Sequence, residues 1–142
     1  MKEIYELAKK AGACSPGLRE IEKAASVNDL IRLLKTGKGI EFIMDSDFLN
    51  ASVFNKYRKE LEKECVFLDG THALKNPRLV ILIGGNVDIE VNGFQVCEVY
   101  AKSDAEINIV AYDNAYVSVE THGNAVLTSE VYGMAKLKEY RK

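Results

Sequence analysis

The sequence predicts an α+β chain, in which a helical N-terminal lobe precedes a short β-solenoid, similar to a single-stranded β-helix and built from ten-residue repeats. Three observations predict this fold. The last forty residues repeat every ten, apolar and polar residues alternate through the second half, and the first seventy residues carry apolar residues at helical spacing instead. We therefore expect two lobes, residues 1–72 and residues 73–142.

The repeat is clearest in four consecutive blocks, SDAEINIVAY, DNAYVSVETH, GNAVLTSEVY and GMAKLKEYRK. The third place of each block is alanine and the fifth is aliphatic, as at Ala105 and Ile107. Earlier residues keep the same register, with Cys97 and Val87 ten and twenty residues before Ile107. A fixed period of this kind is typical of arrays in which each unit stacks on the last.

The parity of the apolar residues favours a solenoid over a meander of hairpins. Odd-numbered residues in 79–131 are mostly apolar and often β-branched, which is typical of half-buried strands. Gly, Asn and Asp recur every ten residues and mark corners, because these residues tolerate positive φ. A meander of two-residue hairpins would turn the apolar set to the other face at each hairpin, unless every hairpin carried a β-bulge. In a solenoid all the odd positions stay inside.

The N-terminal lobe carries signals for helices. Ser15-Pro16 places proline at the first turn of a helix, Ser26-Val27-Asn28-Asp29 resembles a capping box, and Asn50 caps a further helix. Two short apolar runs, residues 40–44 and 65–68, predict strands. We expect helices within residues 2–11, 15–25, 26–37 and 51–64.

The final block predicts a cap on the solenoid. Glu139 replaces the aliphatic seventh residue, Arg141 and Lys142 follow, and Ser129 weakens the same column one block earlier. An open sheet edge can pair with other chains, and charges at that edge discourage such pairing. The last block therefore reads as a terminal, atypical repeat.

Composition excludes several classes of protein. The chain has 142 residues and a net charge of −2, so it carries no electrostatic footprint for nucleic acid. Its longest strongly apolar run, residues 79–83, is too short to span a membrane, and the opening residues predict an amphipathic helix rather than a signal peptide. Three widely spaced cysteines suggest reduced thiols. We expect a cytoplasmic protein without nucleic-acid or membrane partners.

Metal-ligating residues lack the spacing that a metal site requires. No CxxC or HxxxH pair occurs among the cysteines and histidines, so we expect neither a metal nor a cofactor. Cys97 falls in an inward column of the repeat and reads as a core residue. The residues considered are Cys14, Cys65, Cys97, His72 and His122.

The candidate binding residues are Tyr112, Tyr116, Glu120, His122 and Tyr132. Tyr112, His122 and Tyr132 share a place in the repeat. They form a ladder with steps of about 4.8 Å if a coil holds ten residues, or lie on opposite sides if it holds twenty. The resulting aromatic and acidic strip suits a flat or sugar-like ligand, a contact between copies, or a plain solvated face.

These features favour a non-catalytic module for protein interaction or assembly, which contacts a protein partner or another copy of itself. No catalytic residue is assigned. The alternative is a small-molecule or carbohydrate binder, or an enzyme, that uses the junction between the lobes. There Asp45, Asp47, Asp69 and His72 would offer carboxylates and an imidazole for acid–base chemistry.

The sequence resembles two groups of proteins. Its period of ten is similar to that of pentapeptide-repeat proteins, although the Ala-x-aliphatic pattern matches on alternate fives only. It more closely resembles uncharacterised small proteins of gut Bacteroides and their phages. The shared features are the helical N-terminal part, the segments at residues 74–78 and 80–84, and DNAxVxV-like units as at residues 113–119. This resemblance implies a phage or mobile-element setting and brings no activity with it.

Overall fold

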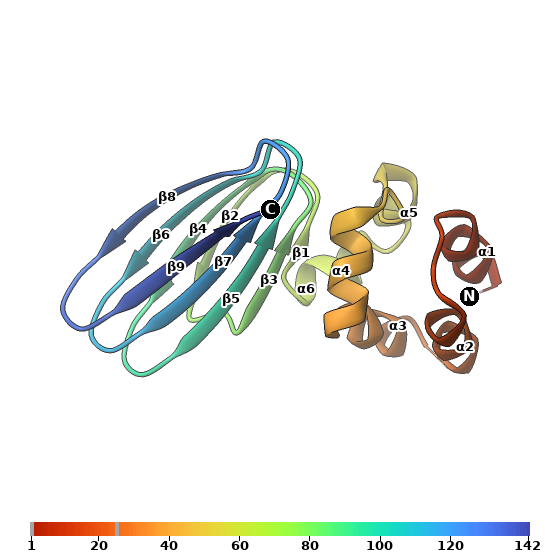
Figure 1. The fold of residues 1–142 in the computed structure, drawn as a ribbon, viewed down its shortest axis with the longest axis horizontal. Helices are drawn as coiled ribbons and strands as arrows, with labels where there is room; N and C mark the ends of the chain where they lie inside the picture. Colours follow the sequence, from red (N-terminus) through yellow and green to blue (C-terminus); the bar gives the residue numbers. More distant parts are fainter. Residues whose placement is uncertain (1, 25) are drawn as a thin grey trace. The chain divides into compact units, whose positions relative to one another are not determined.

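The computed structural model describes residues 2–24 and 26–142 and divides the chain into two compact units, Met1–Glu64 and Cys65–Lys142. The first unit is helical and the second is built from strands (Figure 1). The predicted combination of a helical lobe and a β-solenoid is therefore confirmed. No helix in the described part of the chain is long and apolar enough to cross a membrane.

The helical unit contains short helices that begin at capping side chains. Ser26, Thr36 and Asn50 each accept a hydrogen bond from the backbone N–H three residues on, at 3.2, 3.3 and 3.1 Å. The predicted caps at Ser26 and Asn50 are thus confirmed. In order the helices are α1 Lys2–Lys10, α2 Ser15–Lys23, α3 Val27–Leu34, α4 Gly37–Asp45, α5 Ala51–Lys56 and α6 Arg58–Lys63. Ala25, the last residue of the second predicted helix, lies outside the described residues.

The predicted strand at residues 40–44 is wrong, because this segment lies in α4. Thr36 caps the helix, and Ile40, Ile43 and Met44 fall at helical spacing on its buried side. The predicted helix over residues 51–64 is divided into α5 and α6 at Tyr57, whose backbone leaves the helical region with φ −121° and ψ 23°. Phe54 and Leu61 are nevertheless buried on either side of this break.

The second unit is a β-solenoid with two parallel sheets. One sheet has the strand order β1-β3-β5-β7-β9 and the other has the order β2-β4-β6-β8, so that the chain alternates between the sheets (Figure 1). All neighbouring strands are parallel, which excludes the meander of hairpins. The strands are β1 Val66–Phe67, β2 Thr71–Lys75, β3 Leu79–Leu82, β4 Asn86–Val91, β5 Val96–Ala101, β6 Glu106–Ala111, β7 Tyr116–Thr121, β8 Val126–Val131 and β9 Lys136–Arg141.

A complete coil holds twenty residues, because Val96 pairs with Tyr116 and Glu106 pairs with Val126. The ten-residue repeat of the sequence is therefore half a coil, one strand and one corner. The first coil is shorter, since Val66 pairs with Ile81. Each corner of the regular coils carries one residue in the left-handed region, with φ near 60° at Gly93, Ser103, Asp113, Gly123 and Gly133.

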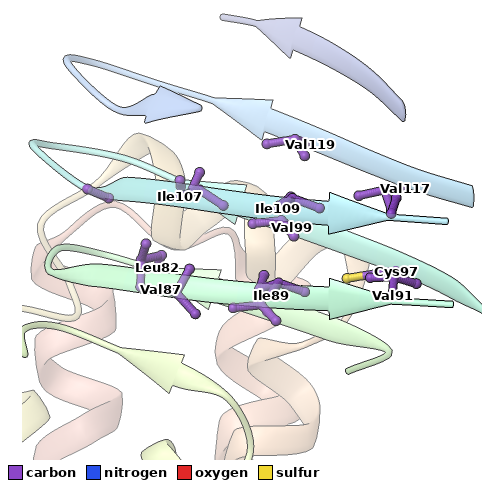
Figure 2. Close-up of a cluster of buried hydrophobic side chains, with 14 of the residues drawn as sticks. Leu82, Val87, Ile89, Val91, Cys97, Val99, Ile107, Ile109, Val117 and Val119 are labelled. Carbon is purple, nitrogen blue, oxygen red and sulfur yellow. The ribbon is translucent and has the colours of Figure 1, made fainter. Parts of the chain in front are cut away.

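The predicted inward residues from Val87 to Ala125 form the core of the solenoid. The prediction is wrong in β3, where Val80 and Leu82 face the interior instead of Leu79 and Ile81, because β3 pairs with β5 at a spacing of nineteen residues and the parity is reversed. Val131, in the last coil, is exposed. Apolar side chains from both sheets meet between them and are almost completely shielded from water (Figure 2). In register, Val87 lies below Ile107, and Cys97 lies below Val117. Val or Ile at most places and Ala before each of β6 to β9 keep the interior narrow and dry.

Polar side chains occupy the same inner columns at the C-terminal end. In register, Ser129 of β8 follows Ile109, and Glu139 of β9 follows Val119. The guanidinium of Arg141 donates to the carbonyl oxygens of Gly123 and Ala125. These residues lie in the last two strands, where the sequence predicts a cap.

Candidate functional site

The twenty-residue coil divides the five candidate binding residues between two edges of the solenoid. Tyr112 and Tyr132 follow β6 and β8 and lie in the corners that lead to β7 and β9. His122 follows β7 and lies in the opposite corner, which leads to β8. The continuous ladder that a ten-residue coil would make is therefore wrong, and the alternative of opposite sides is confirmed.

Hydrogen bonds hold Tyr112 in place at the first of these edges. Its phenol donates to Oε1 of Glu90 at 2.8 Å and accepts from Nδ2 of Asn92 at 3.0 Å. Asn92 in turn pairs with Asn76, whose Nδ2 lies 2.9 Å from Oδ1 of Asn92. A polar column thus runs across three coils, and it orients Tyr112 rather than leaving it free.

Tyr132 is the more accessible tyrosine, with 55% of its surface exposed. Its phenol donates a 2.8 Å hydrogen bond to Oε2 of Glu130, so the two residues share one side of the solenoid. This hydrogen bond and the negative charge of Glu130 raise the pKa of the Tyr132 phenol. The phenol stays protonated and serves as a hydrogen-bond donor.

Exposed apolar side chains gather along this same edge. Of the eight large hydrophobic residues that the described chain exposes, six lie in or beside these corners: Phe94, Val96, Val110, Val131, Tyr132 and Met134. Phe94 and Met134 are 83% and 72% exposed. We call the surface formed by Phe94, Val96, Tyr112, Tyr116, Tyr132 and Met134 the aromatic edge.

The backbone fixes the spacing of the aromatic edge. The N–H of Asn114 donates to the Gly93 carbonyl at 2.9 Å, and the N–H of Met134 donates to the Asp113 carbonyl at 2.9 Å. Phe94 and Met134 therefore occupy equivalent corner places two coils apart, about 9.6 Å at the usual strand spacing. Tyr116 lies between Val96 and Lys136 in the neighbouring column of sheet partners.

Sequence reasoning missed Phe94 and Met134 because both lie in turns. A signal was present, however. The second place of the block is Asp or Asn at residues 104, 114 and 124, whereas it is Phe at 94 and Met at 134. An apolar side chain in a corner place that is otherwise polar has no packing role in the repeat, and this marks it as a surface feature.

Glu120 and His122 lie at the other edge. Oε2 of Glu120 is 2.7 Å from Nε2 of His122, and both side chains are largely covered. On the outer face Glu120 pairs in register with Tyr100 and Tyr140. Burial, followed by the charges of Glu98 and Glu120, raises the pKa of the Tyr100 phenol. We call the corners at residues 102–105 and 122–125 the polar edge.

Asp45, Asp47, Asp69 and His72, the residues of the acid–base hypothesis, belong to local structure within their own units. Nε2 of His72 lies 2.8 Å from the Asp69 carbonyl oxygen, and the imidazole stacks on the ring of Phe67 with centroids 3.9 Å apart. Asp45 ends α4 in the helical unit, and Asp47 follows it. The contacts of His72 orient its ring against the base of the solenoid.

The cysteines and the other possible metal ligands do not form a metal site in the described residues. No group of three or more His, Cys, Asp or Glu side chains within residues 2–24 and 26–142 is placed to hold a metal ion. All three cysteines are free thiols. Burial raises the pKa of Cys97 to about 12, with smaller contributions from Cys65 and Glu98, so this thiol is a core group as predicted.

Comparison with known proteins adds no relative to this picture: no protein-family model, curated protein or solved structure matches the chain.

Proposed function

We propose that the chain is a non-catalytic protein-interaction or assembly module, and that the aromatic edge is its contact surface. The observation that supports this most is the gathering of exposed apolar side chains along one edge of a rigid solenoid. Phe94 and Met134 project from corners where nothing in the repeat covers them. Burying such side chains against a partner releases water from apolar surface and favours association.

The frame of the solenoid suits this role. Parallel sheets hold the corners at a fixed spacing, so that little conformational freedom is lost when a partner binds. Tyr112 is already oriented by Glu90 and Asn92, and Tyr132 by Glu130. Aromatic side chains with polar tips of this kind are enriched in protein interfaces. The proposed partner is a protein or a second copy of the chain.

The polar edge provides an internal comparison. Its corner places hold Asp104 and Asn124 where the aromatic edge holds Phe94 and Met134. Both edges share the same backbone, so the difference lies in the side chains alone. A substitution on the polar edge is therefore a matched control for one on the aromatic edge.

The test is the molar mass by light scattering over a range of concentrations. We compare the wild type with the double variant Phe94→Glu and Met134→Glu, and with the control Asn124→Glu. An oligomer that the double variant dissolves and the control preserves supports self-assembly through the aromatic edge. An oligomer that the double variant leaves intact contradicts it.

If the wild type is a monomer, the next experiment searches for a different protein as the partner. A photo-crosslinking residue at position 94 is then expected to capture one defined protein in cells of the source organism, and the same residue at position 124 is not. Equal capture from both positions contradicts the proposed surface. We further propose a cytoplasmic setting, supported by three free cysteines, and a phage or mobile-element origin, supported by the resemblance of the sequence alone.

A further inference from the structure

We infer that the helical unit contains a separate binding site for a small molecule with an apolar body and a positively charged amine. The site is a cavity of about 380 Å³ between α2 and α4, with the end of α3 at its base. All of its lining residues belong to the helical unit. Its volume lies in the range that small-molecule pockets occupy.

The walls of the cavity are mainly apolar. Ile21 from α2 and Leu34 from α3 are buried there, and Leu33 and Phe42 are half-buried. Gly39 brings the first turn of α4 against the end of α3, because a Cβ at this position would lie 2.5 Å from the Leu33 carbonyl oxygen. Gly39 therefore allows α4 to pack closely against the end of α3 beside the cavity.

The rim of the cavity is acidic. Glu20 comes from α2, and Glu41 and Asp45 lie four residues apart on α4, so that both project from one side of that helix. One ammonium group, that of Lys38, lies among the lining residues beside these three carboxylates. Within the described part of the chain, none of the three carboxylates is held in an ion pair. The surplus negative charge favours a cation at the mouth.

The two features together define the class of ligand. The apolar walls favour an aliphatic or aromatic body, and the carboxylates select an ammonium group over a neutral or anionic one. Three compounds test this selection with one constant body: 2-phenylethylammonium, 2-phenylethanol and phenylacetate. They carry a charge of +1, 0 and −1.

Cys14 provides the readout. Its thiol is exposed and lines the cavity, where it lies 3.3 Å from the Cβ that Gly17 would carry. Occupancy of the cavity should shield this thiol from alkylation by iodoacetamide, measured on the Cys14 peptide by mass spectrometry. With 2-phenylethylammonium at ten times its Kd we expect alkylation to slow about tenfold, because only the empty fraction reacts.

The order of protection decides the inference. We expect 2-phenylethylammonium to protect most, 2-phenylethanol less and phenylacetate not at all, with the advantage of the amine falling as salt is added. In a triple variant that carries Glu20→Gln, Glu41→Gln and Asp45→Asn, the protection of Cys14 by 2-phenylethylammonium should fall to that given by 2-phenylethanol. Equal protection by all three compounds, or protection by none, overturns the inference. The comparison on the wild type stands even if the triple variant fails to fold. None of these outcomes bears on the aromatic edge.

Discussion

Thr121 and Glu139 meet at the C-terminal end of the solenoid, where Oγ1 of Thr121 donates a 3.0 Å hydrogen bond to Oε2 of Glu139. Thr121 is fully buried, whereas the exposed Glu139 pairs in register with Val119 on an inner column, in the last strand that the structure describes. The carboxylate thus satisfies a buried hydroxyl on one side and presents a charge to solvent on the other. A charge at this place opposes the stacking of a second chain on the last coil.

Replacing Glu139 by valine should therefore promote end-to-end association. The inner column would then read Val99, Val119 and valine, an apolar end that is able to stack. We expect the mass measured by light scattering to rise with concentration more steeply than for the wild type. The control is Lys138→Val, which adds the same apolar side chain to the outer face of β9. Equal association in both variants would show that surface hydrophobicity, and not the cap, sets the effect.

A second prediction concerns the solenoid core. Ile109 is almost completely buried between Ile89 and Ser129 in register. Ile109→Ala should lower the free energy of unfolding by about 2 to 5 kcal/mol, because it removes buried methyl groups and leaves a cavity. The measurement is urea unfolding of the full chain, followed by the far-ultraviolet dichroism of the strands.

The neighbouring residue supplies the control for this core variant. Asn108 is exposed on the outer face of β6, and its Nδ2 donates a 3.0 Å hydrogen bond to Oδ1 of Asp88. Asn108→Ala should change the free energy of unfolding by no more than about 0.5 kcal/mol. If the two variants lose similar stability, the assignment of the odd-numbered residues to the interior is contradicted.

The architecture of the solenoid was largely predictable, because the alternation of apolar and polar residues along the sequence determines which side chains are buried. Buried Val and Ile at odd positions, with left-handed corners every ten residues, exclude simple hairpins. The length of the coil was not predictable, since one repeat of ten suits a coil of ten or of twenty. The pairing of Val96 with Tyr116 shows that a coil holds twenty residues. This coil length also places His122 and Tyr112 at opposite edges of the solenoid.

The errors in the helical unit have a different cause. A short run such as residues 40–44, with four apolar residues and Glu41, fits a strand or a buried helical turn equally well, and here the cap at Thr36 selects the helix. The aromatic edge was predicted in part. The repeat indicates Tyr112, Tyr116 and Tyr132, whereas Phe94 and Met134 lie in turns, where the pattern reports the backbone conformation alone.

A third prediction concerns the corner at Gly93, where φ is +61°. Asp113 holds the same corner place with the same φ, so the position accepts a side chain that tolerates the left-handed region. Gly93→Val should cost about 1 to 2 kcal/mol of unfolding free energy, since a β-branched residue is strained there, whereas Gly93→Asn should cost less. A Cβ at this place meets no atom within 4 Å, so crowding does not explain a loss. Equal losses for Val and Asn in urea unfolding would contradict this account.

A fourth prediction separates the thiols. Cys97 is fully buried and its pKa is raised to about 12, whereas Cys14 is exposed. At pH 8 iodoacetamide should alkylate Cys14 and leave Cys97 unmodified in the folded chain, because the reactive thiolate is both scarce and shielded at Cys97. In denaturant both thiols should react. Labelling of Cys97 at the rate of Cys14 under folding conditions, seen by peptide mass spectrometry, would contradict its place in the core.

The last prediction concerns Tyr132 and Glu130 on the aromatic edge. The carboxylate accepts the phenolic hydrogen bond and repels the phenolate, so it favours the protonated phenol and raises the pKa of Tyr132. Glu130→Gln removes the charge and should lower that pKa toward its ordinary value. The measurement is an NMR titration of ring-labelled tyrosine, with Thr128→Ala on the same face of β8 as the control. Because the folded pKa is the higher one, this hydrogen bond contributes its stability below the pKa of an unfolded tyrosine and loses it as pH rises through the higher folded value. An unchanged or higher Tyr132 pKa in Glu130→Gln would mean that the phenol is held by other groups, and that Glu130 does not orient it for contact with a partner.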